Sequence, residues 1–287
     1  MQRFSGERLS KHGYWRVGGP MEDFALVESV PELVELYPQI RWILGNGSNL
    51  LAPDQGLEGL TVRLALKETE WLPGDRLRAG AGLLNTVLLS RVFRQGLCGL
   101  APLAGVPGTV GGAVAMNAGT ALGEIAEVLE AVEGVDAQGF RTLSRAELPM
   151  HYREGGLPEG FVVTAAIFRL RREGVEEERQ KVNHHLQRRM ATQPLDMPSC
   201  GSVFRNPPGD HAGRLIESVG LKGWRSGGAC ISERHANFIV NEGDATATDV
   251  MHCIRTAWER VRDQAGVTLV PEVRVLGDWP AELWPLR

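Results

Sequence analysis

The chain has 287 residues, of which 43% are hydrophobic and 23% are charged, a composition typical of an ordinary soluble globular protein. Its net charge of −4 gives no indication of the basic surface that binds nucleic acid. No apolar run reaches the ~18 residues of a membrane span and no signal region opens the chain, so we expect a cytoplasmic protein without membrane insertion.

The first expected unit, residues 1–60, alternates short apolar runs with turns. Residues 24–27 and 42–44 are expected to be strands, and residues 31–37 a short helix. The second strand leads into a glycine-rich turn, Gly45-Asn46-Gly47-Ser48-Asn49-Leu50. This turn lacks the third glycine and the long helix of a dinucleotide fingerprint, so taken alone it indicates only a tight turn.

The second expected unit, residues 61–172, contains a second glycine-rich stretch. Strands are expected at 61–64, 77–80, 129–136 and 162–170, with a hairpin turn at 73–75 and a helix at 84–95 that ends at Gly96. Seven glycines lie between Gly96 and Gly119, and Thr109 is placed to begin a short helix there. Because so much glycine with so little charge lets backbone approach a ligand closely, the two turns together favour a pyrophosphate cradle.

The remaining residues predict a linker helix at 173–193 and a third unit at 194–271. The apolar face of the linker helix would consist of Val175, Val182, Leu186 and Met190. In the third unit, Thr246 and Asp249 resemble a capping box before a helix that ends at Gly266. A strand at 267–270 would then lead to Pro271-Glu272-Val273-Arg274, and the tail 272–287 is expected to pack near the first unit.

Neither the cysteines nor the histidines form a metal-binding pattern. The four cysteines lie far apart without a Cys-x-x-Cys pair, so we expect reduced structural thiols rather than zinc ligands or a disulfide scaffold. No metal site is expected.

Three short motifs carry groups that suit the addition of hydride and a proton across a polarised double bond. Ser202 offers a hydroxyl proton donor, Arg153 a fixed cation and Glu272 a carboxyl group. Each has an ordinary structural alternative, such as an exposed Tyr152-Arg153 pair or a salt bridge between Glu272 and Arg274. An unpaired buried carboxylate would cost roughly several kcal/mol, so Glu272 needs either a partner or a function.

Taken together, these motifs resemble the UDP-N-acetylenolpyruvoylglucosamine reductases, the MurB family. The similarity runs from about Arg16 to Gly277, with the motifs in the family's order. The chain departs from the family pattern where Gly13-Tyr14-Trp15-Arg16 replaces Asn-Thr-x-Arg and where Tyr152-Arg153-Glu154-Gly155 replaces Tyr-Arg-x-Ser. The short spacing between Tyr152 and Ser202 resembles the compact type, which lacks an insert in the substrate domain.

The resemblance implies an α+β fold, in which a two-domain FAD-binding module of the vanillyl-alcohol-oxidase (PCMH) type precedes an α+β substrate-binding domain. It also implies NADPH-dependent reduction of the enolpyruvyl group of UDP-N-acetylglucosamine enolpyruvate, which gives UDP-N-acetylmuramate for peptidoglycan precursors. The FAD is expected to be non-covalent, because residues 44–51 contain no histidine or cysteine and neither Cys98 nor His151 matches a tethering motif. A monomer is favoured.

The resemblance also assigns roles to individual residues. Arg153 and Glu272 would withdraw electron density through the substrate carboxylate, with Glu272 carrying or sharing a proton, and Ser202 would protonate the resulting enolate-like carbon. Substrate-binding candidates are Tyr152, Arg205, Asn206 and Arg214. FAD-binding candidates are Gly45, Asn46, Gly47, Ser48, Asn49, Leu50, Gly105, Pro107, Gly108, Thr109, Gly111, Gly112, Ala113, Asn117, Ala118 and Gly119.

Two other functions are compatible with parts of the pattern. A flavin-dependent oxidase or dehydrogenase of a small alcohol would use the same cradle but would need no pair that polarises a carboxylate. A non-catalytic UDP-sugar-binding protein would keep the cradle without the reaction, and the presence of Arg153, Ser202 and Glu272 argues against it.

Overall fold

The computed structural model describes residues 1–286, which divide by their contacts into two compact units. Unit 1 contains residues 1–4, 24–46 and 59–188, and unit 2 contains residues 5–23, 47–58 and those from 189 onward. The boundaries expected from the sequence follow a different division and stay predictions. Among the described residues, no helix combines the length and apolar character needed to cross a membrane.

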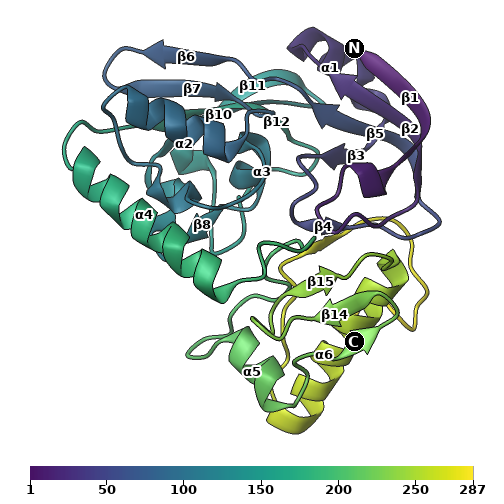
Figure 1. Ribbon diagram of the computed structural model, residues 1–287. Helices are drawn as coiled ribbons and strands as arrows, with labels where there is room; N and C mark the ends of the chain where they lie inside the picture. Colours follow the sequence, from purple (N-terminus) through teal and green to yellow (C-terminus); the bar gives the residue numbers. More distant parts are fainter. Residues whose placement is uncertain (287) are drawn as a thin grey trace. The chain divides into compact units, whose positions relative to one another are not determined.

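A five-stranded antiparallel sheet organises unit 1, in the order β11-β10-β12-β7-β6 (Figure 1). Its strands are β6 (Thr69–Leu72), β7 (Arg76–Gly80), β10 (Leu129–Asp136), β11 (Gly139–Ser144) and β12 (Val162–Arg169). The strands expected at 77–80, 129–136 and 162–170 are confirmed, as is the turn at 73–75 that joins β6 to β7. Apolar residues in these segments and the Pro73-Gly74-Asp75 turn indicated the strands from the sequence.

A second sheet has the order β1-β2-β5-β3 and includes the first strands of the chain. It consists of β1 (Gln2–Arg8), β2 (Pro20–Val27), β5 (Leu57–Leu64) and β3 (Ile40–Leu44), and β3 runs parallel to β5. The expected helix between two of these strands is α1 (Val30–Leu36), whose N-cap Ser29 accepts a hydrogen bond from the Glu32 N–H.

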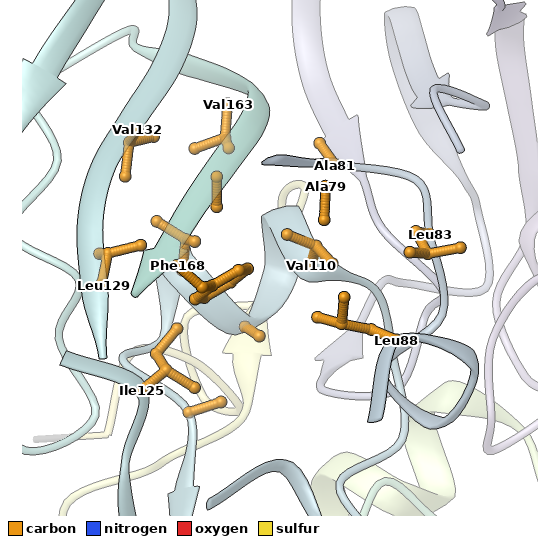
Figure 2. Close-up of a cluster of buried hydrophobic side chains, with 14 of the residues drawn as sticks. Ala79, Ala81, Leu83, Leu88, Val110, Ile125, Leu129, Val132, Val163 and Phe168 are labelled. Carbon is orange, nitrogen blue, oxygen red and sulfur yellow. The ribbon is translucent and has the colours of Figure 1, made fainter. Parts of the chain in front are cut away.

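The helices of unit 1 pack on an apolar core. Besides α1, they are α2 (Asn85–Arg94), α3 (Val110–Ala115) and α4 (Val175–Thr192), and the last residues of α4 belong to unit 2 by contact. Helix α3 packs against β12 and β7. Its first residue, Val110, is fully buried and lies near Leu83 and Phe168 in the cluster that Figure 2 shows. This burial fixes the start of α3 and therefore the glycine-rich turn before it.

Unit 2 is built around a long helix and a small antiparallel sheet. Helix α6 (Ala247–Ala265) contacts α5 (Ala212–Ser218) and the strands β13 (Arg225–Ser226), β14 (Ala229–Ile231) and β15 (Ile239–Asn241). The expected capping box of Thr246 and Asp249 is confirmed, and Gly266 ends the helix at φ +68°. The short strands β4 (Leu50–Leu51) and β16 (Arg274–Val275) pair in parallel.

The remaining elements are short. They are β8 (Gly119–Thr120), β9 (Gly123–Glu124) and the 3-10 turns η1 (Leu9–Lys11), η2 (Tyr37–Gln39), η3 (Ala101–Leu103), η4 (Ile125–Glu127) and η5 (Arg145–Glu147). The four cysteines are buried and unpaired, as expected.

Two expectations about local structure were wrong. Residues 267–270 do not form a strand, because their contact with the neighbouring segment is limited to the Arg205 N–H bond to the Val270 carbonyl and an isolated bridge at Pro271. The apolar face expected on α4 is incomplete, since Met190 is 62% exposed while the acidic Glu178 is buried.

Candidate active site

The first glycine-rich turn, residues 45–50, connects β3 to β4 and is shaped by packing against residues 12–14. Gly47 has φ +63°, and a Cβ atom there would lie 2.1 Å from the His12 carbonyl oxygen. The Tyr14 N–H donates to the Gly47 carbonyl oxygen at 2.9 Å. Glycine is therefore required at position 47 by the protein's own packing.

The asparagine side chains of this turn are used inside the protein. Asn46 Oδ1 accepts from Arg63 Nη2 at 2.8 Å. Asn49 Nδ2 donates to the Glu272 carbonyl oxygen at 3.1 Å, and the Asn49 carbonyl accepts from the Arg274 N–H at 3.0 Å. Any contact of this turn with a flavin would therefore come mainly from its backbone, while Asn49 fastens the turn to the Glu272 segment.

The second glycine-rich turn, residues 105–112, leads into α3, and Thr109 is the N-cap residue as expected. The N–H groups of Val110 and Gly111 donate to the carbonyl oxygens of Leu83 and Ala81, each at 2.9 Å. Two first-turn amides of this six-residue helix therefore bind carbonyl oxygens of the protein itself.

The neighbouring glycines of this turn have different surroundings. A Cβ atom at Gly111 would lie 2.9 Å from the Ala81 Cβ, which is too close for an unshifted backbone. A Cβ atom at the exposed Gly112 would meet only Thr109 Oγ1, at 3.8 Å. Thr109 Oγ1 also lies 3.3 Å from the Cβ position of Gly45, so the first residue of the first turn approaches the second turn at this threonine.

Arg153 lies at the tip of a tight turn in unit 1. The backbone groups of His151 and Glu154 exchange two hydrogen bonds of 2.9 Å, which leaves Tyr152 and Arg153 between them. Arg153 has φ +61°, and its guanidinium carbon lies 4.7 Å from the centroid of the Tyr152 ring. A non-glycine residue with left-handed φ costs about 1 kcal/mol or more and is found preferentially at functional sites.

The Arg153 turn is held by Asn117 and by α3. Asn117 is buried, and its Nδ2 donates to the His151 carbonyl at 3.0 Å and to Glu124 Oε2 at 2.7 Å. The Gly155 N–H donates to the Ala115 carbonyl at 3.1 Å. The departure at Gly155 has a physical reason, because a Cβ atom there would lie 2.1 Å from the Val114 carbonyl oxygen. The second glycine-rich turn and the Arg153 turn therefore adjoin opposite ends of α3.

Ser202 and Glu272 lie on adjoining backbone segments of unit 2. Ser202 forms an isolated antiparallel bridge with Phe238 on one side. On the other side the Glu272 N–H donates to the Val203 carbonyl at 2.7 Å. Both Ser202 and Glu272 are half-buried. The structure therefore places Ser202 and Glu272 on neighbouring backbone segments.

Two further contacts of unit 2 connect the Ser202 motif with earlier parts of the chain. Cys200 Sγ lies 3.7 Å from the carbonyl oxygens of both Gly47 and Leu50, and burial raises the pKa of this thiol to about 12. Trp15, which follows the departures at Gly13 and Tyr14, is buried and donates from Nε1 to the Ile239 carbonyl at 2.6 Å. Trp15 thus forms part of the core of unit 2.

Two of the candidates for the substrate diphosphate form side-chain hydrogen bonds with other groups of the protein. Asn206 Oδ1 accepts from the Ala212 N–H at 3.1 Å, so its side chain caps α5. Arg214 forms two hydrogen bonds with Asp210 and lowers the pKa of that carboxyl group to about 2. Arg205 is half-buried, and Tyr152 is 44% exposed. Asn206 and Arg214 therefore already have partners within the protein.

The sequence analysis missed Asn237. This residue is 3% exposed and forms hydrogen bonds with the residues that follow Ser202. A signal was available, because an amide within the apolar run from Ala236 to Val240 must find partners when it is buried.

Comparisons with known proteins show the family to which the chain belongs. Residues 27–143 match the family profile of the FAD binding domain, and residues 193–276 match that of the UDP-N-acetylenolpyruvoylglucosamine reductase C-terminal domain. The reductase of Moorella thermoacetica is 43% identical over 285 residues, covering 97% of this chain and 94% of the relative. The reductase of a Synechococcus strain is 45% identical, covering 94% and 91%.

A solved structure leads to the same conclusion. The crystal structure of UDP-N-acetylenolpyruvylglucosamine reductase from Thermus caldophilus has a TM-score of 0.85 and 39% identity, covering 97% of this chain and 98% of the other. The expected fold class is confirmed. The chain belongs to the UDP-N-acetylenolpyruvoylglucosamine reductase family.

Proposed function

We propose that this protein reduces the enolpyruvyl group of UDP-N-acetylglucosamine enolpyruvate with NADPH and FAD, giving UDP-N-acetylmuramate. Family membership supports this function. The structural observation that carries it is the backbone contact between Val203 and Glu272, because it holds a hydroxyl group and a carboxyl group of the expected types on adjoining segments. A small-alcohol oxidase would need no such arrangement, and the comparisons do not favour it.

The residues of the two glycine-rich turns fit a flavin nucleotide. No residue between Gly105 and Ala113 is charged, and the backbone at Gly112 is open. Backbone can therefore approach a pyrophosphate without repulsion from a carboxylate. When FAD is bound, it supplies the transfer of hydride from NADPH to the substrate. We expect this binding to be non-covalent.

Arg153 and Glu272 would prepare the substrate for hydride addition. A simple enol ether accepts hydride poorly, so electron density must be withdrawn through the neighbouring carboxylate. The planar guanidinium of Arg153 is permanently charged and can bind a carboxylate with two hydrogen bonds. A proton carried by Glu272, or shared with the substrate, would stabilise the same charge as it develops.

Ser202 would donate the proton to the adjacent carbon after hydride addition. A serine hydroxyl is a weak acid, but an enolate-like carbon is strongly basic, and general acid assistance is typically worth about 10²–10⁴ in rate. The candidates for the substrate diphosphate stay Arg205, Asn206 and Arg214, of which Asn206 and Arg214 also form hydrogen bonds within the protein. A cytoplasmic monomer stays our prediction.

An anaerobic absorbance experiment tests the function. The purified protein should be yellow, NADPH should bleach it, and UDP-N-acetylglucosamine enolpyruvate should restore the colour. Recovery of colour with oxygen but not with this substrate would instead indicate an oxidase. Arg153→Lys and Glu272→Gln should slow recovery by substrate and leave bleaching by NADPH unchanged, because both groups act on the substrate alone. Equal slowing of both steps would contradict these roles.

A further inference from the structure

We infer that Asn237 is a positioning residue that holds Ser202 in place for protonation of the substrate. The inference rests on the proposed function, because it concerns the same proton transfer. Asn237 is not expected to touch the substrate. It would act through the backbone of the two residues that follow Ser202.

The side-chain amide of Asn237 binds both backbone groups of Phe204. The Phe204 N–H donates to Asn237 Oδ1 at 3.0 Å, and Asn237 Nδ2 donates to the Phe204 carbonyl at 2.8 Å. The main chain adds a third hydrogen bond, from the Val203 N–H to the Asn237 carbonyl at 2.9 Å. Because Asn237 and Phe204 are buried, no water can replace these bonds when the amide is removed.

Asn237 is itself fixed by the turn that carries it. Its N–H lies 3.3 Å from His235 Nδ1, and the Phe238 N–H donates to the His235 carbonyl at 2.9 Å. The rings of His235 and Phe238 meet edge to face with centroids 4.8 Å apart. The amide therefore presents a fixed donor and a fixed acceptor to Phe204 rather than an adaptable one.

The segment after Ser202 is thus held on both sides. Asn237 binds it on one side, and the Glu272 N–H binds the Val203 carbonyl on the other. A proton donor must be held close to its productive position, since a misplacement of about 1 Å can cost about 10²-fold in rate. Loss of the Asn237 amide would remove two of the three hydrogen bonds by which Asn237 holds the segment that sets the position of the Ser202 hydroxyl.

Asn237→Leu removes the amide and keeps the branched shape and the number of heavy atoms of the side chain, and Asn241→Leu is its matched control. Asn241 is also a buried amide of unit 2, bound to the backbone of Trp15, Gly243 and Ala245. We expect Asn237→Leu to slow reoxidation by UDP-N-acetylglucosamine enolpyruvate about 10- to 100-fold and to spare reduction by NADPH. Asn241→Leu should lower stability without slowing reoxidation in this selective way.

A double-mutant cycle with Ser202→Ala separates positioning from a general structural effect. If Asn237 acts through the Ser202 hydroxyl, the double variant should reoxidise no more slowly than Ser202→Ala alone. The inference would be overturned if the two substitutions slowed reoxidation by factors that multiply in the double variant. It would also be overturned if Asn237→Leu reoxidised at the parental rate while Ser202→Ala reoxidised slowly. Either result would leave the proposed function intact. If Ser202→Ala reoxidised at the parental rate, Ser202 would not be the proton donor.

If the leucine variant does not fold, Asn237→Asp replaces it in the test, because it keeps the acceptor for the Phe204 N–H. We expect Asn237→Asp to slow reoxidation selectively but less than Asn237→Leu would. A parental rate of reoxidation in Asn237→Asp would equally overturn the inference.

Discussion

Gly111 and Gly112 are adjacent residues whose replacement should have different consequences. Gly111→Val places a side chain against Ala81, so we expect loss of stability by about 1–3 kcal/mol whether or not FAD is present. Gly112→Val places it in open space beside the second turn, so we expect loss of FAD while the apoprotein keeps its Tm. The ratio of flavin to protein absorbance measures the FAD content of each variant, and the Tm of both apoproteins measures their stability. Full FAD occupancy in Gly112→Val would show that this residue is not part of the cradle.

Single polar residues were the hardest to assign from the sequence. The motifs drew attention to the segments that contain Asn46, Asn117 and Asn206, but the side chains of these residues bind groups of the protein itself. A sequence shows that an amide is present, but not whether its partner is a ligand or a backbone group several turns away. The assignments of Arg153, Ser202 and Glu272 stay predictions, now with a structural reason for two of them to act together.

Helices and strands that follow a regular local sequence pattern could be predicted, whereas those that depend on contacts with distant segments of the chain could not. The expected strands of the five-stranded sheet and the capping box of α6 follow from local sequence, and both are present. Residues 267–270 have strand propensity but lack a paired neighbour along their length. In helix α4 the pattern failed in a different way, because the acidic Glu178 is buried where it binds the N–H groups of Gly99 and Ala101, which lie 79 and 77 residues away in the chain.

Glu178 joins α4 to the loop that precedes the second glycine-rich turn. Its carboxylate accepts from the Gly99 N–H at 2.8 Å, the Ala101 N–H at 3.1 Å and Arg171 Nη2 at 2.7 Å. We expect Glu178→Gln to lower the free energy of unfolding by about 1–3 kcal/mol, because charge-assisted hydrogen bonds are lost in a buried place. The matched control is Glu177→Gln, whose side chain is 69% exposed and pairs with Lys181. It should cost at most about 0.5 kcal/mol.

Urea unfolding of the two variants checks the comparison between Glu178 and Glu177. A similar small change in both would show that the buried carboxylate contributes little to the attachment of α4. FAD content should fall with Glu178→Gln only if the loop at 99–101 transmits the change to the cradle, so the same samples measure that effect.

At the scale of the whole molecule, the sequence predicted the fold class but not which segments belong together. Segments 5–23 and 47–58 group by contact with the C-terminal part of the chain. The contacts responsible join residues about two hundred positions apart, such as Trp15 with Ile239 and Leu50 with Arg274. Apolar patterning shows that Trp15 will be buried, but it does not identify the element that buries it.

The four buried thiols predict how the stability of the molecule depends on pH. Burial raises the pKa of all four, and for Cys200 and Cys253 it does so from 9.0 to about 12. Below about pH 8 the folded and unfolded chains both keep nearly all of these protons, so ionisation has little effect on stability there. Between about pH 9 and pH 12 the unfolded chain releases protons that the folded chain retains, so the free energy of unfolding must fall as pH rises.

Cys253→Ala and Cys200→Ala isolate this contribution, because alanine cannot ionise and any cavity that it leaves costs the same at every pH. Between about pH 8 and about pH 10.5, each thiol should account for a loss on the order of 2 kcal/mol in the parent that is missing in its variant. Urea unfolding at several pH values measures the two slopes, and the titration of lysines and tyrosines cancels in their difference. Parallel slopes for parent and variant would mean that the thiol ionises as readily in the folded chain as in the unfolded one, contrary to its burial.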